Sequence, residues 1–245
     1  MLPDLTTPIF DVTLPYTAKT IRARPFLVRE EKLLLMAAAS KITKDIIDTT
    51  LQVVQNCLID SEVKAADLPF FEVDYLFIAL RAKSVGETVE INFKCNNRVG
   101  DIGLTTPCGH IFPVALDILK AEIVKPKEVD KKIALTPTKD VGAKMRYPNY
   151  ADMKTIMSEV NDLESKLRII KASIDTIWSG DTVYTRKDMT PEDLDKFIDG
   201  LTKGQLSLLE EWVDNFPHFE ISTTKQCPKC KFEHKITYGD FRSFF

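Results

Sequence analysis

The sequence lacks the motifs that most often mark a nucleotide-binding or catalytic protein. It has nine glycines in 245 residues and contains neither a GxGxxG nor a GxxxxGK[ST] run, which excludes the common glycine-rich phosphate loops. Histidine is also scarce, with three residues, and neither GxSxG nor HExxH occurs. Because no catalytic set can be assembled from these residues, we expect a protein that is not an enzyme.

Long apolar runs and an excess of one charge are absent as well. The longest apolar run, Leu33–Ala39, is far shorter than the roughly 20 residues of a membrane-spanning helix. No basic region followed by an apolar run opens the chain, so we expect an intracellular protein without a membrane partner. Lys and Arg total 33 against 36 Asp and Glu, a net charge of −3, which weighs against general affinity for nucleic acid.

The apolar residues that are present follow both helical and strand periodicities. Spacing of three or four residues predicts helices over 28–58, with a break near 40–43, and over 73–83, 150–178, 191–198 and 206–213. Thr190-Pro191 followed by two acidic residues is typical of a helix start. Alternation of polar and apolar residues predicts strands over 87–93, 111–119, 218–223 and 232–238, and 121–146 reads as short strands and turns.

These patterns predict an α+β protein with a mainly helical body and an antiparallel β module assembled from two distant segments. We expect an N-terminal lead and helical region at 1–86 and the first half of the β module, with extra strands, at 87–148. An inserted helical region follows at 149–216, and 217–245 holds the second half of the module and the C-terminal tail.

Four of the five cysteines fall in the predicted β module. Cys227 and Cys230 flank a two-residue turn as in a zinc knuckle, and Cys95 and Cys108 bound a polar loop of 12 residues between two strands. A longer loop adds little closure entropy. Four thiolates leave no open position on a tetrahedral Zn²⁺, so we predict a structural zinc site resembling a zinc ribbon, with these four cysteines as ligands.

Alternatives remain open for the predicted metal site. His110 and His234 follow cysteines closely, and either can replace one of the four as a ligand. Unlinked free thiols and a redox-active CxxC are the other interpretations of the four cysteines. Cys57 lies on the apolar side of a predicted helix and is expected to be a buried small residue without a metal.

Several segments resemble the T4-type bacteriophage baseplate hub assembly family. A short extended lead into a charged helix start is the first of them. The resemblance spans nearly the whole chain and is more specific in 24–118 than in 120–216. The segments that carry it are Arg24–Ala37, Leu68–Phe77, Leu80–Glu87, Phe93–Cys95, Cys108–His110 and Cys227–Cys230.

The resemblance implies a non-enzymatic phage protein that is needed to build the central hub of a contractile-tail baseplate. It would act in the host cytoplasm during assembly as a chaperone of the tape-measure or hub proteins. The alternatives are a permanent structural subunit of the virion's tail baseplate and a nucleic-acid-binding zinc-ribbon protein. The charged face at the start of the first helix, Arg29, Glu30, Glu31 and Lys32, is the predicted docking face, with a plain solvated helix start as its alternative.

Overall fold

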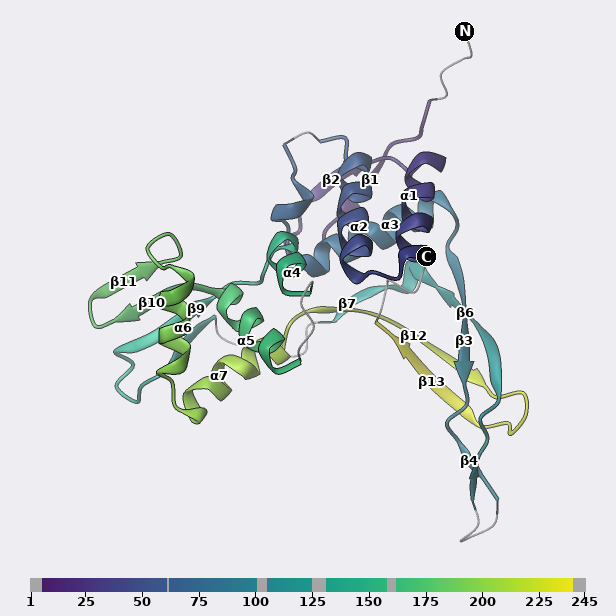
Figure 1. Cartoon of the computed structure of the whole chain (residues 1–245). Helices are drawn as coiled ribbons and strands as arrows, with labels where there is room; N and C mark the ends of the chain where they lie inside the picture. The colour runs from purple at the N-terminus through teal and green to yellow at the C-terminus, as the bar shows by residue number, and fades with distance from the viewer. Residues whose placement is uncertain (1–5, 61, 101–104, 125–130, 158–161, 240–245) are drawn as a thin grey trace.

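The computed structural model describes residues 6–60, 62–100, 105–124, 131–157 and 162–239, and its elements gather into two lobes (Figure 1). The first lobe begins with a hairpin of β1 (Phe10–Thr13) and β2 (Thr20–Ala23). Three helices follow, α1 (Val28–Ser40), α2 (Thr43–Cys57) and α3 (Phe70–Ser84). Lys41 takes a left-handed backbone (φ 57°) between α1 and α2, which confirms the break predicted near 40–43.

The rest of the first lobe is built from β strands. The hairpin of β3 (Thr88–Lys94) and β6 (Ile111–Asp117) carries a small pair, β4 (Arg98–Val99) and β5 (Thr106–Pro107), at its far end (Figure 1). A second hairpin, β12 (His218–Gln226) and β13 (Glu233–Tyr238), pairs through β12 with β7 (Glu122–Val124). Short 3₁₀ turns lie at Ala65–Asp67 and Ile118–Lys120. The buried faces of these strands share one core with the helices.

The second lobe is a four-stranded antiparallel sheet covered by helices. Its strand order is β11 (Thr182–Thr185), β10 (Ile174–Ser179), β9 (Val141–Met145), β8 (Lys132–Ala134). The helices α5 (Asp162–Ser173), α6 (Pro191–Asp199) and α7 (Lys203–Asp214) contribute to its separate core. Thr190 caps α6 through a capping box, and Pro191 opens the helix, which confirms the helix start predicted there.

The prediction of a mainly helical body is wrong. The described part of the chain is 40% helix and 30% strand, and its strands form five small antiparallel sheets, so the fold is α+β with a large β component. The clearest difference lies in 150–178, where helix ends at Ser173 and β10 begins at Ile174. Ile174 and Ile177 satisfy helical spacing, but the β-branched run pairs with β9, and such residues favour strands.

The two lobes meet at a cluster of aromatic rings. Rings from the β1–β2 turn, α3, the segment before α4 (Tyr150–Met157) and the end of α7 contact one another at centroid distances of 4.9–5.9 Å. These residues are Tyr16, Phe70, Phe71, Tyr147, Trp212 and Phe216. Edge-to-face pairs of this kind add specificity to simple burial.

Across the described residues, no helix is both long enough and apolar enough to cross a membrane.

Candidate metal centre

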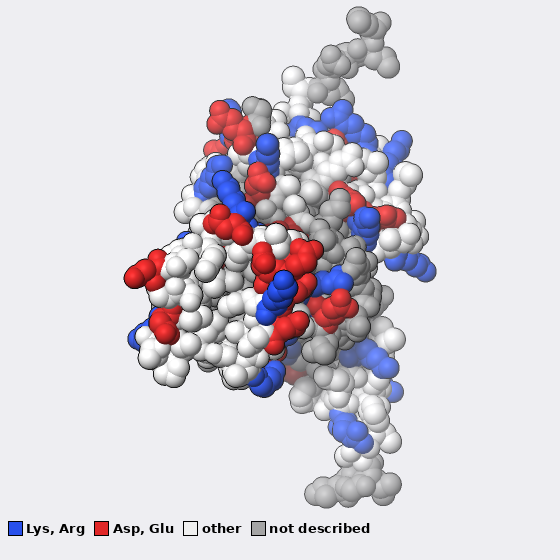
Figure 2. Space-filling view, turned by 60° about the vertical axis from the view of Figure 1, so that its left-hand side comes forward, with Lys and Arg blue, Asp and Glu red and all other residues white. Residues whose placement is uncertain are grey.

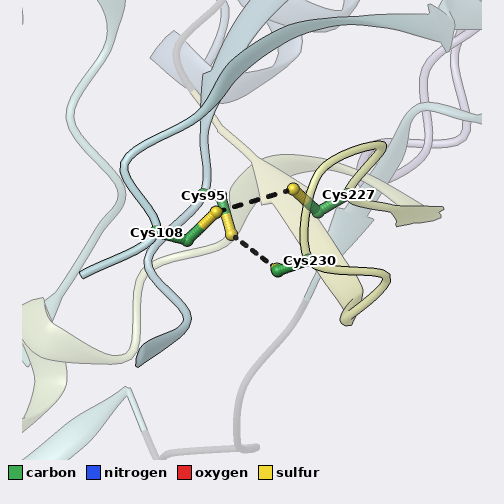
Figure 3. A group of neighbouring side chains, drawn as sticks. All are labelled: Cys95, Cys108, Cys227 and Cys230. Carbon is green, nitrogen blue, oxygen red and sulfur yellow. Dashed lines mark hydrogen bonds between the residues drawn. The ribbon is translucent and has the colours of Figure 1, made fainter. Parts of the chain in front are cut away.

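The four cysteines of the β module converge at one point between the two hairpins. Figure 3 shows the four side chains gathered together, and all four sulfur atoms lie within 4.8 Å of one another. Two separations link the halves: Sγ of Cys95 lies 3.6 Å from Sγ of Cys230, and Sγ of Cys108 lies 4.0 Å from that of Cys227. Sulfurs around tetrahedral Zn²⁺ lie about 3.8 Å apart. The set can therefore hold one metal ion.

Backbone hydrogen bonds bring Cys95 and Cys108 together despite the loop between them. The N–H of Cys95 donates to the His110 carbonyl at 2.8 Å, and the N–H of Cys108 donates to the Asn97 carbonyl at 2.8 Å. Gly109, with φ of 60°, turns the chain and donates its N–H to the Cys95 carbonyl. The loop is thus closed immediately beyond the two cysteines, and its length does not disturb the site.

The second half of the site repeats this design. The N–H of Cys227 donates to the Phe232 carbonyl at 2.8 Å, and the N–H of Lys231 donates to the Cys227 carbonyl at 2.9 Å. Lys231, which follows Cys230, has the same left-handed φ of 60° as Gly109 after Cys108. Both halves are therefore tight turns at hairpin ends, each presenting its two thiols on one side.

The four thiols differ in burial and in their electrostatic surroundings. Cys95, Cys108 and Cys227 are buried and Cys230 is partly buried. Burial raises the pKa of the Cys95 thiol to about 12, whereas the side-chain amide of Asn97, 3.5 Å from Sγ of Cys230, lowers the pKa of Cys230 to about 6. Four adjacent thiolates repel one another, so full deprotonation needs a bound metal ion.

The remaining candidate ligands lie outside this set. His234 is buried with Nε2 3.1 Å from Sγ of Cys95, but only the four cysteines form the set of mutually close ligand atoms among the described residues. The His110 ring stacks on Phe112 at 6.1 Å. Cys57 is fully buried on α2, 3.8 Å from the Arg24 guanidinium, and burial raises its pKa to about 11.

The structure separates the four charged residues at the start of α1. Glu30 is 1% exposed, and its carboxylate accepts hydrogen bonds from Arg24 (3.0 Å), Arg29 (2.8 Å) and the Leu27 N–H (2.8 Å). Arg29 and Lys32 are exposed and Glu31 is partly exposed. Since Glu30 holds the helix start together from within, it is not part of a face that a partner can reach.

A second candidate site is an apolar groove between α1 and α3, whose lining residues were not identified from the sequence. It encloses about 190 Å³. The groove is lined by Phe26, Glu31, Leu34, Leu35, Phe77, Arg81 and Val85. On the adjoining face of α1, Leu35 is 57% and Met36 70% exposed. The four large apolar residues that open the run Leu33–Ala39 were the available signal, because four consecutive side chains on a helix cannot all face the same core.

The surface charge gives little support to a nucleic-acid interface. On the face shown in Figure 2, the Lys and Arg side chains are scattered and Asp and Glu side chains lie among them, without a continuous basic patch. The chain as a whole carries −3. Nucleic-acid binding ordinarily relies on clustered positive charge, which the face shown in Figure 2 does not present.

Comparison with known proteins identifies the family. The family model described as T4 bacteriophage base plate protein matches residues 7–245. No curated protein and no solved structure matches the chain. The family model covers both lobes and all four cysteines of the site. The chain therefore belongs to the T4 bacteriophage base plate protein family.

Proposed function

We propose that this protein is a non-enzymatic factor in the assembly of the tail baseplate hub, and that it acts as a chaperone for the tape-measure protein or another hub protein. The observation that carries the proposal is the exposed apolar surface of α1 beside its groove, in a chain of the base plate family. An apolar surface of this kind on a soluble protein marks a site that a partner covers.

The groove suits an amphipathic helix of the partner. α1 has 13 residues, a length of about 20 Å, enough to hold several turns of a second helix. Leu34 and Phe77 form apolar walls, whereas Glu31 and Arg81 place opposite charges in the lining. Apolar contacts would supply affinity, and the two charges would fix the direction of the bound helix. The tape-measure protein, which we expect to be elongated and largely helical, fits this description.

Co-expression with the neighbouring tail proteins, followed by affinity capture, tests the docking surface. Leu35→Asp and Met36→Asp should abolish capture of the tape-measure or hub protein, because each places a charge on the apolar face. Leu208→Asp is the matched control, since Leu208 is also an exposed leucine (41%) but lies on α7 in the second lobe. Equal capture by all three variants would refute the docking surface.

Purified virions separate the chaperone from a permanent subunit. A chaperone should be present in the assembly complexes but absent from finished particles when these are analysed by mass spectrometry. A constant copy number in purified particles would instead establish a structural subunit of the baseplate, with the groove as its contact to a neighbouring tail protein.

We further propose that the four cysteines hold a structural Zn²⁺. Cys108 and Cys227 are 119 positions apart in the chain, so the ion would join segments that the second lobe separates. Four thiolate ligands leave no position for water or substrate, so the ion would be structural. The bound ion would hold the ends of the two hairpins together.

Metal analysis of the purified protein tests the zinc site. We expect about one zinc per chain. Cys230→Ser should release the zinc and lower the melting temperature, whereas Cys57→Ala should keep it because Cys57 lies on α2, outside the set of four close sulfur atoms. Zinc retained at full stoichiometry in Cys230→Ser, or lost in Cys57→Ala, would show that the ligand set is wrong.

A further inference from the structure

We infer that His234 and Asn97 are hydrogen-bond donors to the metal-bound thiolates, that neither is a ligand, and that together they tie the two hairpins across the metal site. The inference rests on the proposed zinc site. It assigns a role to two polar side chains that the ligand set alone does not explain, and it decides between the four-cysteine set and one in which a histidine replaces a cysteine.

The position of His234 is fixed by its strand and by aromatic neighbours. On β13 it pairs with Lys225 of β12. Its ring lies 5.1 Å from that of Phe93 and 4.9 Å from that of Phe232. In this position Nε2 lies 3.1 Å from Sγ of Cys95, which is hydrogen-bonding distance to a ligand atom. An imidazole protonated at Nε2 donates to the thiolate in this geometry.

Asn97 makes the corresponding contact in the opposite direction. Its carbonyl accepts the N–H of Cys108 at 2.8 Å, which anchors Asn97 to the first hairpin. Its side-chain Nδ2 lies 3.5 Å from Sγ of Cys230, which belongs to the second hairpin. An amide nitrogen is only a donor, so the direction of this hydrogen bond is settled by chemistry.

Each hairpin therefore donates one hydrogen bond to a cysteine of the other hairpin. His234 of the second hairpin contacts Cys95 of the first, and Asn97 of the first contacts Cys230 of the second. Zn²⁺ with four thiolates carries two negative charges in a buried place, and N–H donors spread that charge. A thiolate that accepts such hydrogen bonds is also a weaker nucleophile, which slows alkylation and oxidation. The donors should make the site slow to lose zinc.

The test uses the zinc-loaded full chain and two substitutions at one position. His234→Leu removes the donor and keeps much of the volume, whereas His234→Gln keeps an N–H. Zinc release during alkylation with N-ethylmaleimide is followed with a chromogenic chelator. We expect His234→Leu to keep one zinc and to release it about five-fold faster, the factor of one ordinary hydrogen bond. His234→Gln should resemble the wild type. Asn97→Ala should also release zinc faster.

Cobalt substitution provides the decisive second readout. The thiolate-to-Co²⁺ charge-transfer intensity should be that of four sulfurs in the wild type and unchanged in His234→Leu. A wild-type spectrum with three sulfurs and one nitrogen that changes in His234→Leu, or loss of metal in both His234 variants, would make His234 a ligand and overturn the inference. Equal release rates in all variants would also overturn it. A wild type that binds no zinc would refute the proposed metal site itself, a result distinct from these.

Discussion

The substitution Glu30→Gln tests how the start of α1 is held. The Glu30 carboxylate is 1% exposed and lies between Arg24, itself mostly buried, and the exposed Arg29. It also accepts the Leu27 N–H and so caps the helix. A glutamine keeps the size and one carbonyl oxygen but removes the charge. The Arg24 guanidinium is then left buried without a counter-charge, which is a costly state.

The pKa of Glu30 gives the magnitude. Burial by itself raises this pKa, but the hydrogen bonds from Arg29, Arg24 and the Leu27 N–H outweigh burial and lower it from 4.5 to about 2. A difference of about 2.5 pH units corresponds to about 3 kcal/mol in the free energy of unfolding. Because Arg29 is exposed, solvent screens its contribution, and the stabilisation is at most about 3 kcal/mol.

The sign of the pH dependence follows from the lowered pKa. The stabilisation by Glu30 is fully present above about pH 4.5 and is lost as the pH falls toward about 2. Between these values the Glu30 carboxylate is protonated in the unfolded chain but still ionised in the folded chain, so lowering the pH favours unfolding. Glu30→Gln has no such titration. The difference in unfolding free energy between wild type and variant should therefore be largest at neutral pH and shrink below pH 4.5.

Urea unfolding followed by circular dichroism between pH 7 and pH 3 measures this difference. Glu31→Gln is the control, because Glu31 lies on the same helical turn but is partly exposed. We expect Glu31→Gln to change the free energy of unfolding by less than about 0.5 kcal/mol. A Glu30→Gln variant as stable as Glu31→Gln at pH 7 would refute the role assigned to the buried carboxylate. Charge reversal at Glu30 therefore cannot test partner binding cleanly, since it would unfold the helix start.

Two further substitutions test the packing of each lobe. Glu72 is buried, and its carboxylate accepts hydrogen bonds from the N–H groups of Tyr16 and Thr17 at 3.0 and 2.7 Å. Glu72→Leu should therefore lower the free energy of unfolding in urea by about 3 kcal/mol, and Glu72→Gln should lower it less. An unchanged urea midpoint in Glu72→Leu would contradict this. A Cβ on Gly142 would clash with the Trp178 ring and with the backbone carbonyl of Ile133 on β8. Gly142→Ala should therefore lower stability by about 1–3 kcal/mol, and a wild-type melting curve would contradict this close packing.

Local patterns in the sequence predicted much of the fold. Alternation over 87–93 and 111–119 corresponds to β3 and β6, and the cysteines at their ends lie together, as the prediction of one metal site expected. These features depend on residues near one another in the chain or on a known metal geometry. The prediction failed at β10, where Ile174 begins a strand, because helical and strand patterns coincide there and pairing with β9 decides between them.

The charged start of α1 shows a second limit of sequence reasoning. In the sequence, Glu30 is one of several adjacent charged residues and cannot be told apart from Glu31 and Lys32. In the structure it points inward, because Arg24 is buried beside α2 and donates a hydrogen bond to the Glu30 carboxylate. Which of these adjacent charged side chains is buried depends on the position of Arg24, which directly follows the β1–β2 hairpin. That position is set by tertiary packing and leaves no periodic signal along the chain.

The candidate metal site and the groove beside α1 are connected through α3. Phe77 and Arg81 of α3 line the groove, and α3 also packs on β12 and on the 3₁₀ turn that follows β6. Closing a loop of about 100 residues costs about 4–5 kcal/mol in chain entropy, whereas structural zinc binding provides about 10–16 kcal/mol. A Zn²⁺ bound at the proposed site would thus supply enough free energy to hold the ends of the two hairpins together, although the second lobe lies between them in the chain. Removing zinc should therefore weaken partner binding at α1 even though no groove residue is a ligand, while Leu35→Asp should abolish binding and leave the zinc content unchanged.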